Sequence, residues 1–172
     1  MSKQTDHEQI ISQEISKQYN NMLTQESLDA LDNLKIQLVP RDSGKNILLI
    51  KVDSEVLNTI QQKPHKIQLK LRAMFPDVIS FLVRDSEETD SKTNEKIVSS
   101  NKRQKVFESW AKDLCTPAMY EMRTTTVLTS GEKFDTAYIS NVSEMDDDHL
   151  LAMQNAYHFL TGLTLKYQRY IN

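Results

Sequence analysis

Residues 46–52, with the sequence NILLIKV, decide the fold of this chain, because five of these seven side chains are large and aliphatic. Such a run predicts a buried strand. Just before it, Ile36 and Leu38 alternate with polar residues, and residues 40–44 (PRDSG) have the composition of a turn. The three segments together predict a β-hairpin.

The segments that follow this hairpin predict a helix and a further strand. Residues 66–75 (KIQLKLRAMF) fit both strand alternation and helical spacing, so periodicity alone does not choose between them. We interpret them as a helix because of the ten-residue length and of Pro64 near the start. Pro76 ends this helix, and residues 78–84 (VISFLVR) form a continuous apolar run typical of a strand buried on both faces.

Periodic apolar residues predict helices at the start of the chain and in its second half. Spacings of three and four residues indicate an amphipathic helix over residues 10–23 and a short helix over residues 27–34. A third such helix covers residues 103–115 and stops at Thr116-Pro117. The last helix begins at Asp146-Asp147-Asp148 and ends at Gly162.

Two more strand segments and a polar segment complete the prediction. Residues 122–129 and 133–140 flank Gly131 as a second hairpin, and residues 163–170 form a final strand. Residues 85–101 are almost entirely polar, which is typical of a mobile loop or of a segment ordered by a partner.

The two halves of the chain share the element order helix, hairpin, helix, strand. We therefore predict an α+β fold of two degenerate units, about 1–84 and 103–172, joined by a mobile loop over 85–102 and packed as one domain, 1–172. The order is also explained if short α+β units simply resemble one another. In either case the apolar faces predict six buried residues, namely Ile47, Leu49, Val78, Leu82, Trp110 and Leu151.

Composition predicts a globular protein of the cell interior. The 172 residues are 38% hydrophobic and 26% charged, as in proteins that form one hydrophobic core. No stretch approaches the roughly 20 apolar residues that span a bilayer, and the first residues lack the apolar segment of a secretory signal. The single cysteine, Cys115, cannot form an intramolecular disulfide, so we expect the reducing cytosol and no membrane partner.

The sequence shows no motif that indicates catalysis. Nucleotide-binding, metalloprotease and hydrolase signatures are absent, and the four histidines are isolated. Asp146, Asp147, Asp148 and His149 could suggest a metal site, but aspartates at a helix start more often cap backbone N–H groups. Cys115 follows Asp113 at a helix C-terminus, where the helix dipole opposes a thiolate. We expect no enzyme, cofactor, metal or small-molecule substrate.

The charge pattern leaves room only for local contacts with RNA. The net charge is −3, which argues against a protein coated with cations. Two groups of basic residues could still contact phosphates, and we expect them on one side, with the acidic first helix and the Asp146–Asp148 cap turned to solvent or protein. A solvated surface explains them equally well. The predicted RNA-binding residues are Lys66, Lys70, Arg72, Lys102, Arg103 and Lys105.

The order of these motifs resembles a known family. Residues 44–52 (GKNILLIKV), 66–75 and 78–84 give an apolar strand, a basic helix and an apolar strand ending in arginine. This order resembles the eukaryotic small-subunit ribosomal protein seven (eS-seven) family. The Gly131 hairpin and the passage 159–167 (FLTGLTLKY) are similar to the family's C-terminal part.

The resemblance implies a structural constituent of the cytosolic small ribosomal subunit. Such a protein binds small-subunit ribosomal RNA and neighbouring small-subunit proteins, supports subunit assembly and translation, and is assembled in the nucleus or nucleolus. Basic family positions match Lys66, Lys70 and Arg72, and the end of the family's basic loop matches Lys102 and Arg103. The central loop is shorter here and mixed in charge. The alternative is a free-standing protein-interaction adaptor with the same fold.

Overall fold

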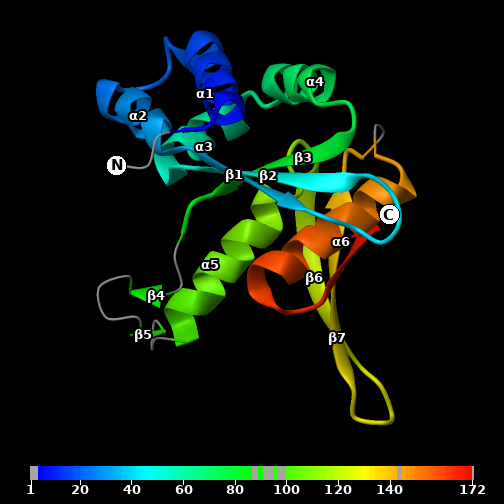
Figure 1. The fold of residues 1–172 in the computed structure, drawn as a ribbon. Coiled ribbons are helices and arrows are strands. Elements are labelled where there is room, and N and C mark those ends of the chain that lie inside the picture. Colours follow the sequence, from blue (N-terminus) through cyan, green and yellow to red (C-terminus); the bar gives the residue numbers. More distant parts are fainter. Residues whose placement is uncertain (1–3, 87–88, 91–94, 97–99, 143–144, 172) are drawn as a thin grey trace.

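The computed structural model describes residues 4–86, 89–90, 95–96, 100–142 and 145–171. It confirms the α+β class (Figure 1). Half of the predicted mobile loop, 85–102, lies outside the described residues. Within that stretch Thr89–Asp90 (β4) pairs antiparallel with Glu95–Lys96 (β5).

The first part of the chain forms two helices and the predicted hairpin. Thr5 and Glu8 form a reciprocal capping box at the start of the first helix, which satisfies backbone N–H groups there. β1 and β2 pair antiparallel, as the alternation around the turn predicts. The elements are α1 (Asp6–Tyr19), α2 (Gln25–Ala30), the 3-10 helix η1 (Leu31–Asn33), β1 (Lys35–Val39) and β2 (Asn46–Val52).

Two helices separate this hairpin from the third strand of its sheet. α3 (Ser54–Gln62) was not predicted, whereas α4 (His65–Met74) and β3 (Val78–Arg84) were. The sequence does carry a signal for α3, because Asp53 caps it and its buried residues Val56, Leu57 and Ile60 have helical spacing. β3 runs parallel to β2, so the sheet has the order β1-β2-β3.

The second half builds a sheet with the same pattern of strand directions. β6 pairs antiparallel with β7, β8 runs parallel to β7, and the order is β6-β7-β8. Gly162, with φ +76°, ends the last helix in the left-handed conformation. The elements are α5 (Ser100–Asp113), β6 (Met119–Val127), β7 (Lys133–Ser140), α6 (Asp147–Thr161) and β8 (Leu165–Arg169).

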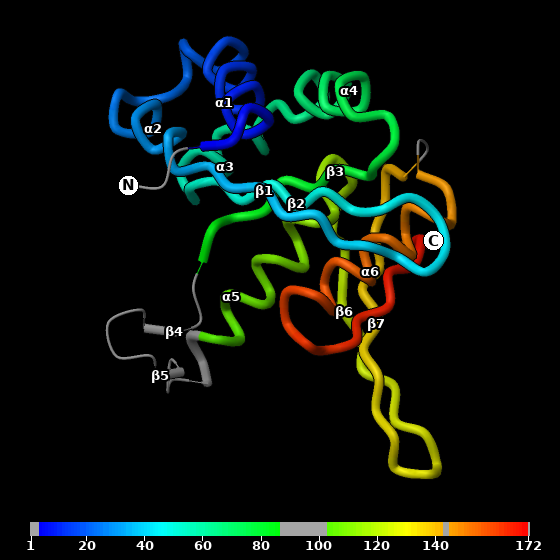
Figure 2. The backbone as a smooth tube through the Cα atoms, in the orientation of Figure 1, coloured from blue at the N-terminus to red at the C-terminus, as the bar shows by residue number. Residues whose placement is uncertain are grey.

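Alternate side chains of β2 enter two different hydrophobic clusters. Ile47 and Leu49 pack in a cluster with residues of α5, α6 and the second sheet. Leu48, Ile50 and Val52 pack in another cluster with residues of α1, α3 and α4. The first sheet is therefore covered on both faces, which explains why residues 46–52 are apolar without alternation. Figures 1 and 2 show α1, α3 and α4 on one side of β2 and β3, and α5 and α6 on the other.

Four of the six residues predicted to be core residues are buried, namely Ile47, Leu49, Leu82 and Trp110. Val78 is only half-buried. The prediction for Leu151 was wrong, because this side chain is 46% exposed. α6 turns Leu150, Met153 and Tyr157 to the core, and Leu151 lies outside that stripe.

A buried carboxylate joins the two halves at the end of β3. The side chain of Asp113 is 1% exposed, and it accepts hydrogen bonds from Arg84 Nε and Nη2 at 2.8 and 2.9 Å. It also accepts from the Arg84 backbone N–H and from Gln61 Nε2 of α3. The indole N–H of Trp110 donates to the Arg84 carbonyl at 2.9 Å. The last turn of α5 is thereby fixed to β3 and α3.

A second ion pair joins the halves at the other end of the first sheet. Arg41, in the β1–β2 turn, is 1% exposed at its side chain and donates to both carboxylate oxygens of Asp148 on α6. Gly44 closes this turn with φ +84°, and a Cβ atom there would lie 2.6 Å from Asp148 Oδ1. Glycine is thus required both by the backbone and by the ion pair.

Replacing Asp113 with alanine is expected to destabilise the protein by about 3–5 kcal/mol, because it leaves the Arg84 guanidinium without its buried partner. Urea unfolding monitored by far-UV circular dichroism measures this loss. The matched control is Asp147→Ala, since Asp147 is 94% exposed in its pair with Arg169 and should change stability little. Equal stability of the Asp113→Ala variant and the wild type would contradict the role of this ion pair.

Gly44→Ala is expected to cost more stability than Gly131→Ala. Both glycines have positive φ, +84° and +92°, so both variants carry a backbone penalty of about 1–2 kcal/mol. A Cβ at Gly131 meets nothing within 4 Å, whereas a Cβ at Gly44 displaces Asp148 from Arg41. The difference between the urea midpoints of the Gly44→Ala and Gly131→Ala variants measures the stability that is lost when Asp148 is displaced. Equal midpoints would show that the Arg41–Asp148 pair adds nothing.

Candidate nucleic-acid interface

Helix α4 presents an exposed basic surface. Ile67 and Leu71 are its buried residues, so Lys66, Lys70 and Arg72 lie on the exposed side, with no acidic residue in the helix. In the part of the chain that the structure describes, none of these three cations forms an ion pair. Their charges are therefore available to an external partner. This surface is called the α4 basic surface below.

Four other arginines of the described residues form ion pairs within the chain. Arg41 and Arg84 join the two halves, and Arg169 pairs with Asp147. Arg123 on β6 binds Asp135 at 2.6 Å and Glu108 of α5 at 2.9 Å. Burial is the largest single effect on the pKa of Asp135 and acts to raise it. The hydrogen bonds from Arg123 and Thr125, together with the charge of Arg123, outweigh burial, so the pKa of Asp135 lies below its ordinary value. These four arginines are occupied by acidic side chains and do not extend the α4 basic surface.

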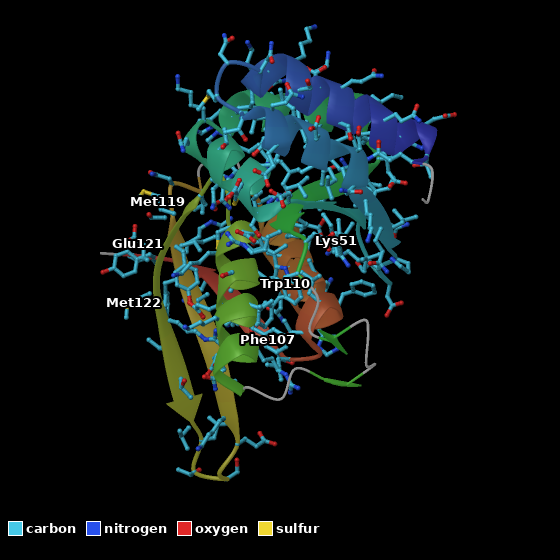
Figure 3. The ribbon with its side chains drawn as sticks, turned by 90° about the vertical axis from the view of Figure 1, so that its left-hand side faces the viewer. Lys51, Phe107, Trp110, Met119, Glu121 and Met122 are labelled. Carbon is cyan, nitrogen blue, oxygen red and sulfur yellow. The ribbon has the colours of Figure 1, made fainter. Side chains whose placement is uncertain are left out.

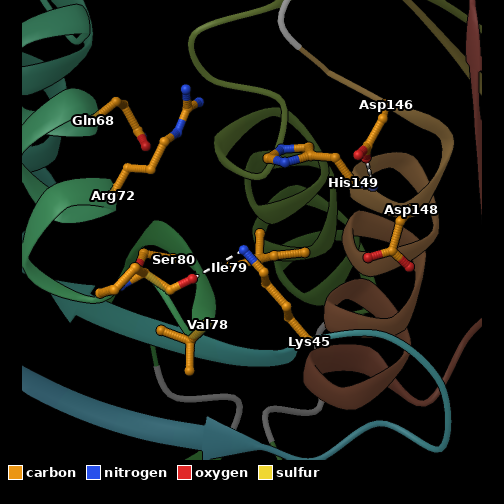
Figure 4. Close-up of a pocket in the computed structure, with 10 residues that line it drawn as sticks. Lys45, Gln68, Arg72, Val78, Ile79, Ser80, Asp146, Asp148 and His149 are labelled. Carbon is orange, nitrogen blue, oxygen red and sulfur yellow. Dashed lines mark hydrogen bonds between the residues drawn. The ribbon is translucent and has the colours of Figure 1, made fainter.

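A groove lies between α4, the start of β3 and the start of α6 (Figure 4). It comprises two cavities of about 210 and 480 Å³. Lys45 lines the smaller cavity, and its Nζ donates a hydrogen bond to the Pro76 carbonyl at 2.9 Å. Residues that line both cavities are Gln68, Arg72, Ser80 and His149. Sequence reasoning missed Gln68, Ser80 and Lys45 as site residues, because they come from separate segments that only the fold brings together.

The acidic start of α6 also lines this groove. Asp146 caps the helix by accepting from the His149 backbone N–H at 2.8 Å, as predicted. Asp146 and Asp147 are exposed to solvent, as expected of the Asp146–Asp148 cap, but the cap is not separated from the basic residues, because Asp146 and Asp148 line the same cavity as Arg72. The cause is the Arg41–Asp148 pair, which brings the start of α6 to the first sheet. The groove is therefore mixed in charge.

His149 in this groove is held in its neutral form. Burial is the largest cause that lowers its pKa, and Arg72 lowers it further, while Asp146 and Asp148 act in the opposite direction. Its ring packs edge-on against Phe81, with 5.4 Å between ring centroids. His149 is consequently a packing residue at the base of the groove and adds no positive charge to it.

The second predicted group of cations lies elsewhere. Lys105 is exposed and Arg103 is half-buried on the first turns of α5, and the side chain of Lys102 lies outside the described residues. Figure 1 shows α4 and the start of α5 at opposite ends of the molecule. The structure does not bring the two groups together on one side, so they are treated below as separate surfaces.

The described residues offer little for catalysis. Burial, reinforced by Asp113 and Glu108, raises the pKa of the Cys115 thiol far above its ordinary value, so Cys115 is protonated and packed. No group of three or more metal-ligating side chains occurs among them. No helix in the described ranges is long and apolar enough to cross a membrane.

Comparison with known proteins supports a ribosomal relationship. The chain is similar to the small ribosomal subunit protein eS7 of Encephalitozoon cuniculi (strain GB-M1), with 26% identity over 117 residues. The match covers 68% of this chain and 66% of that relative, just under two thirds of its length. No protein-family model matches the chain. The similarity is that of a distant relative, and it agrees with the family resemblance of the sequence motifs.

The neutral state of His149 predicts acid sensitivity. Below about pH 6.5 the unfolded chain binds a proton at this histidine that the folded protein does not bind, so the free energy of unfolding falls as the pH falls. Urea unfolding between pH 7.5 and 5 measures how steeply the free energy of unfolding changes with pH. This interval lies above the range in which Asp135 and Asp148 titrate, because the pKa of each is lowered. His149→Gln should flatten this slope. An unchanged slope in that variant would contradict the burial of a neutral imidazole.

Proposed function

We propose that this protein is a structural component of the small ribosomal subunit, attached to ribosomal RNA through the α4 basic surface. The observation that carries the proposal is the similarity to small ribosomal subunit protein eS7. The α4 basic surface supports it, because Lys66, Lys70 and Arg72 are exposed and unpaired among the described residues. Cations of this kind neutralise phosphates and position a protein on folded RNA.

Electrostatics determines how RNA would approach. A protein with a net charge of −3 repels a polyanion unless its cations are local. Asp146 and Asp148 lie on the groove side of Arg72 and oppose phosphate there. RNA is therefore expected on the side of α4 that carries Lys66 and Lys70. Lys102, Arg103 and Lys105 at the start of α5 are proposed as a second, separate RNA contact.

The proposed function also covers the domain organisation, the partners and the location of the protein. The chain acts as one domain over residues 1–172, without catalysis, in contact with neighbouring small-subunit proteins as well as RNA. It supports subunit assembly and translation in the cytoplasm, with assembly in the nucleus or nucleolus. The shared hydrophobic cluster and the two ion pairs, Arg84–Asp113 and Arg41–Asp148, support a single body, since they join residues of both halves.

Sedimentation of a native lysate tests the assignment. The protein should co-sediment with small subunits in near-stoichiometric amount through a sucrose gradient, detected by quantitative mass spectrometry. Retention through a wash at moderate salt would separate a structural component from a loosely bound factor. Recovery mainly in the light fractions would contradict the proposal and favour a free-standing adaptor.

Charge removal tests the α4 basic surface. Changing Lys66, Lys70 and Arg72 together to Gln should weaken association with small subunits. Each lost phosphate contact lowers the slope of log affinity against log salt by about 0.7–0.9, so three lost contacts lower it by roughly 2–3.

The matched control for this variant removes three exposed lysines elsewhere, by changing Lys17, Lys35 and Lys133 to Gln. Both triple variants lose three positive charges, so their net charges are equal. The control should keep the wild-type slope of log affinity against log salt. Far-UV circular dichroism verifies that both variants fold. Equal salt slopes for the two variants would show that α4 is merely solvated.

A further inference from the structure

The groove between α4, β3 and α6 gathers uncharged hydrogen-bonding side chains. Gln68, Ser80 and His149 each come from a different one of these elements, and all three line both cavities of the groove. Figure 4 shows Gln68 and Arg72 on α4 facing His149 of α6 across the open space. The fold therefore surrounds one space with polar groups from distant parts of the sequence.

The hydrogen-bonding capacity of these three side chains is unused within the described residues. The Oγ atom of Ser80 is buried and has no hydrogen-bond partner there. The side-chain amide of Gln68 and the imidazole of His149 form no hydrogen bond with the described residues either. A neutral imidazole offers one donor and one acceptor. Because buried polar groups normally have partners, the groove suits a ligand that carries both donors and acceptors.

The larger cavity has the size and the lining of a site for a small organic group. Its volume is about 480 Å³, within the roughly 300–1,000 Å³ of ligand pockets. Asn141 also lines it and donates to the sulfur of Met119, which Figure 3 shows at the end of β6 away from the hairpin tip. Apolar walls come from Leu69, Phe81, Pro117 and Met145. A flat ring with apolar faces and polar edges matches this lining.

The charges around the groove favour an uncharged ring over a phosphate. Asp146 and Asp148 line the smaller cavity, where their carboxylates repel an anion. Among the described residues that line the larger cavity, none is acidic, and Arg72 is the one arginine or lysine. A guanidinium stacks favourably on the face of an aromatic ring. The larger cavity therefore suits a nucleobase, and the smaller one disfavours the phosphate attached to it.

The lysines of the α4 basic surface adjoin this groove. His65 and Leu69 of α4 line the larger cavity, and each is followed directly by an exposed lysine, Lys66 or Lys70. Residues four apart lie on one stripe of a helix, so the two lysines form a stripe beside the groove. An RNA backbone held by these lysines runs along the edge of the larger cavity. An unpaired base of that RNA is then within reach of the polar groups inside.

We propose that the groove between α4, β3 and α6 binds an unpaired nucleobase of the RNA whose phosphates contact Lys66 and Lys70. The inference rests on the proposed function and deepens it, because it adds a base contact to an attachment made through phosphates. Gln68 and Ser80 hydrogen-bond the edge of the base, and Arg72 lies against its face. Unpaired bases are recognised in this way because their edges and faces are free.

NMR titration of the isotope-labelled full chain with two pentamers tests the inference. One is the single-stranded RNA CAGUA, which carries all four bases, and the other is a pentamer of abasic ribose phosphates with the same number of phosphates. The protein should bind CAGUA about tenfold more tightly, as measured from the shifts of the α4 backbone amides. The side-chain amide of Gln68 should shift saturably with CAGUA and stay in place with the abasic pentamer.

Equal dissociation constants for the two pentamers would overturn the inference, because phosphates alone would then explain the binding. A Gln68 side-chain amide that does not move with CAGUA would overturn it as well. That second result is the one expected if the groove holds a protein segment in place of a base.

Substitutions in the groove remove hydrogen-bonding groups without changing charge. Gln68→Leu should abolish most of the preference for CAGUA over the abasic pentamer, and Ser80→Ala, which removes only the hydroxyl, should reduce it. The matched control is Gln62→Leu, at the exposed end of α3, which should keep the preference. The amide NMR spectrum of each variant verifies its fold. An unchanged preference in both folded groove variants would contradict the base site.

The outcomes separate this inference from the proposed function. A chain that sediments with small subunits but shows no preference for CAGUA overturns the base site and leaves the ribosomal assignment intact. A chain that prefers CAGUA but stays in the light fractions supports the base site and overturns the assignment. A chain of the light fractions without this preference contradicts both.

Discussion

The carboxylate of Asp113 is the constraint on which the arrangement of the two halves depends. A buried carboxylate is costly unless donors surround it, and Asp113 has four, three from Arg84 and one from Gln61. These donors belong to β3 and α3, whereas Asp113 ends α5. The shared hydrophobic cluster would allow several orientations, because apolar packing is not directional. The buried ion pair selects one of them.

The Arg41–Asp148 pair fixes the opposite end of the same sheet. Between the two ion pairs lies β2, whose alternate residues enter both hydrophobic clusters. This frame determines which surfaces remain for function. It engages Arg41 and Arg84 inside the protein and leaves the cations of α4 outside. An acidic chain can thereby present a local basic surface.

Sequence patterns predicted the strands that are buried on both faces and the helices that bury one face. Residues 46–52 and 78–84 have apolar runs that fit strands covered on both faces, and the Asp146 cap and Gly162 mark both ends of α6. The short α3 was missed because its apolar stripe spans only Val56 to Ile60. Leu151 was misassigned because it adjoins Leu150, and one helical position decides which of the two faces the core.

The candidate site was predictable only in part. The cations of α4 stand in one helix, so their common exposure follows from helical periodicity. The ion pairs that join the two halves do not follow from periodicity, because Arg84 and Asp113 are 29 residues apart and Arg41 and Asp148 are 107 apart. Nothing in the sequence indicates which arginine meets which aspartate. The separation of α4 from the start of α5 depends on those same pairings.

The central claim is that both halves form one cooperative body, and urea unfolding with two probes tests it most directly. Fluorescence of the single tryptophan, Trp110, reports the shared cluster and its bond to Arg84. Far-UV circular dichroism reports all helices, including α1, α3 and α4 beyond the first sheet. One body predicts that the two transitions coincide in midpoint and slope. Two separated transitions would contradict the account.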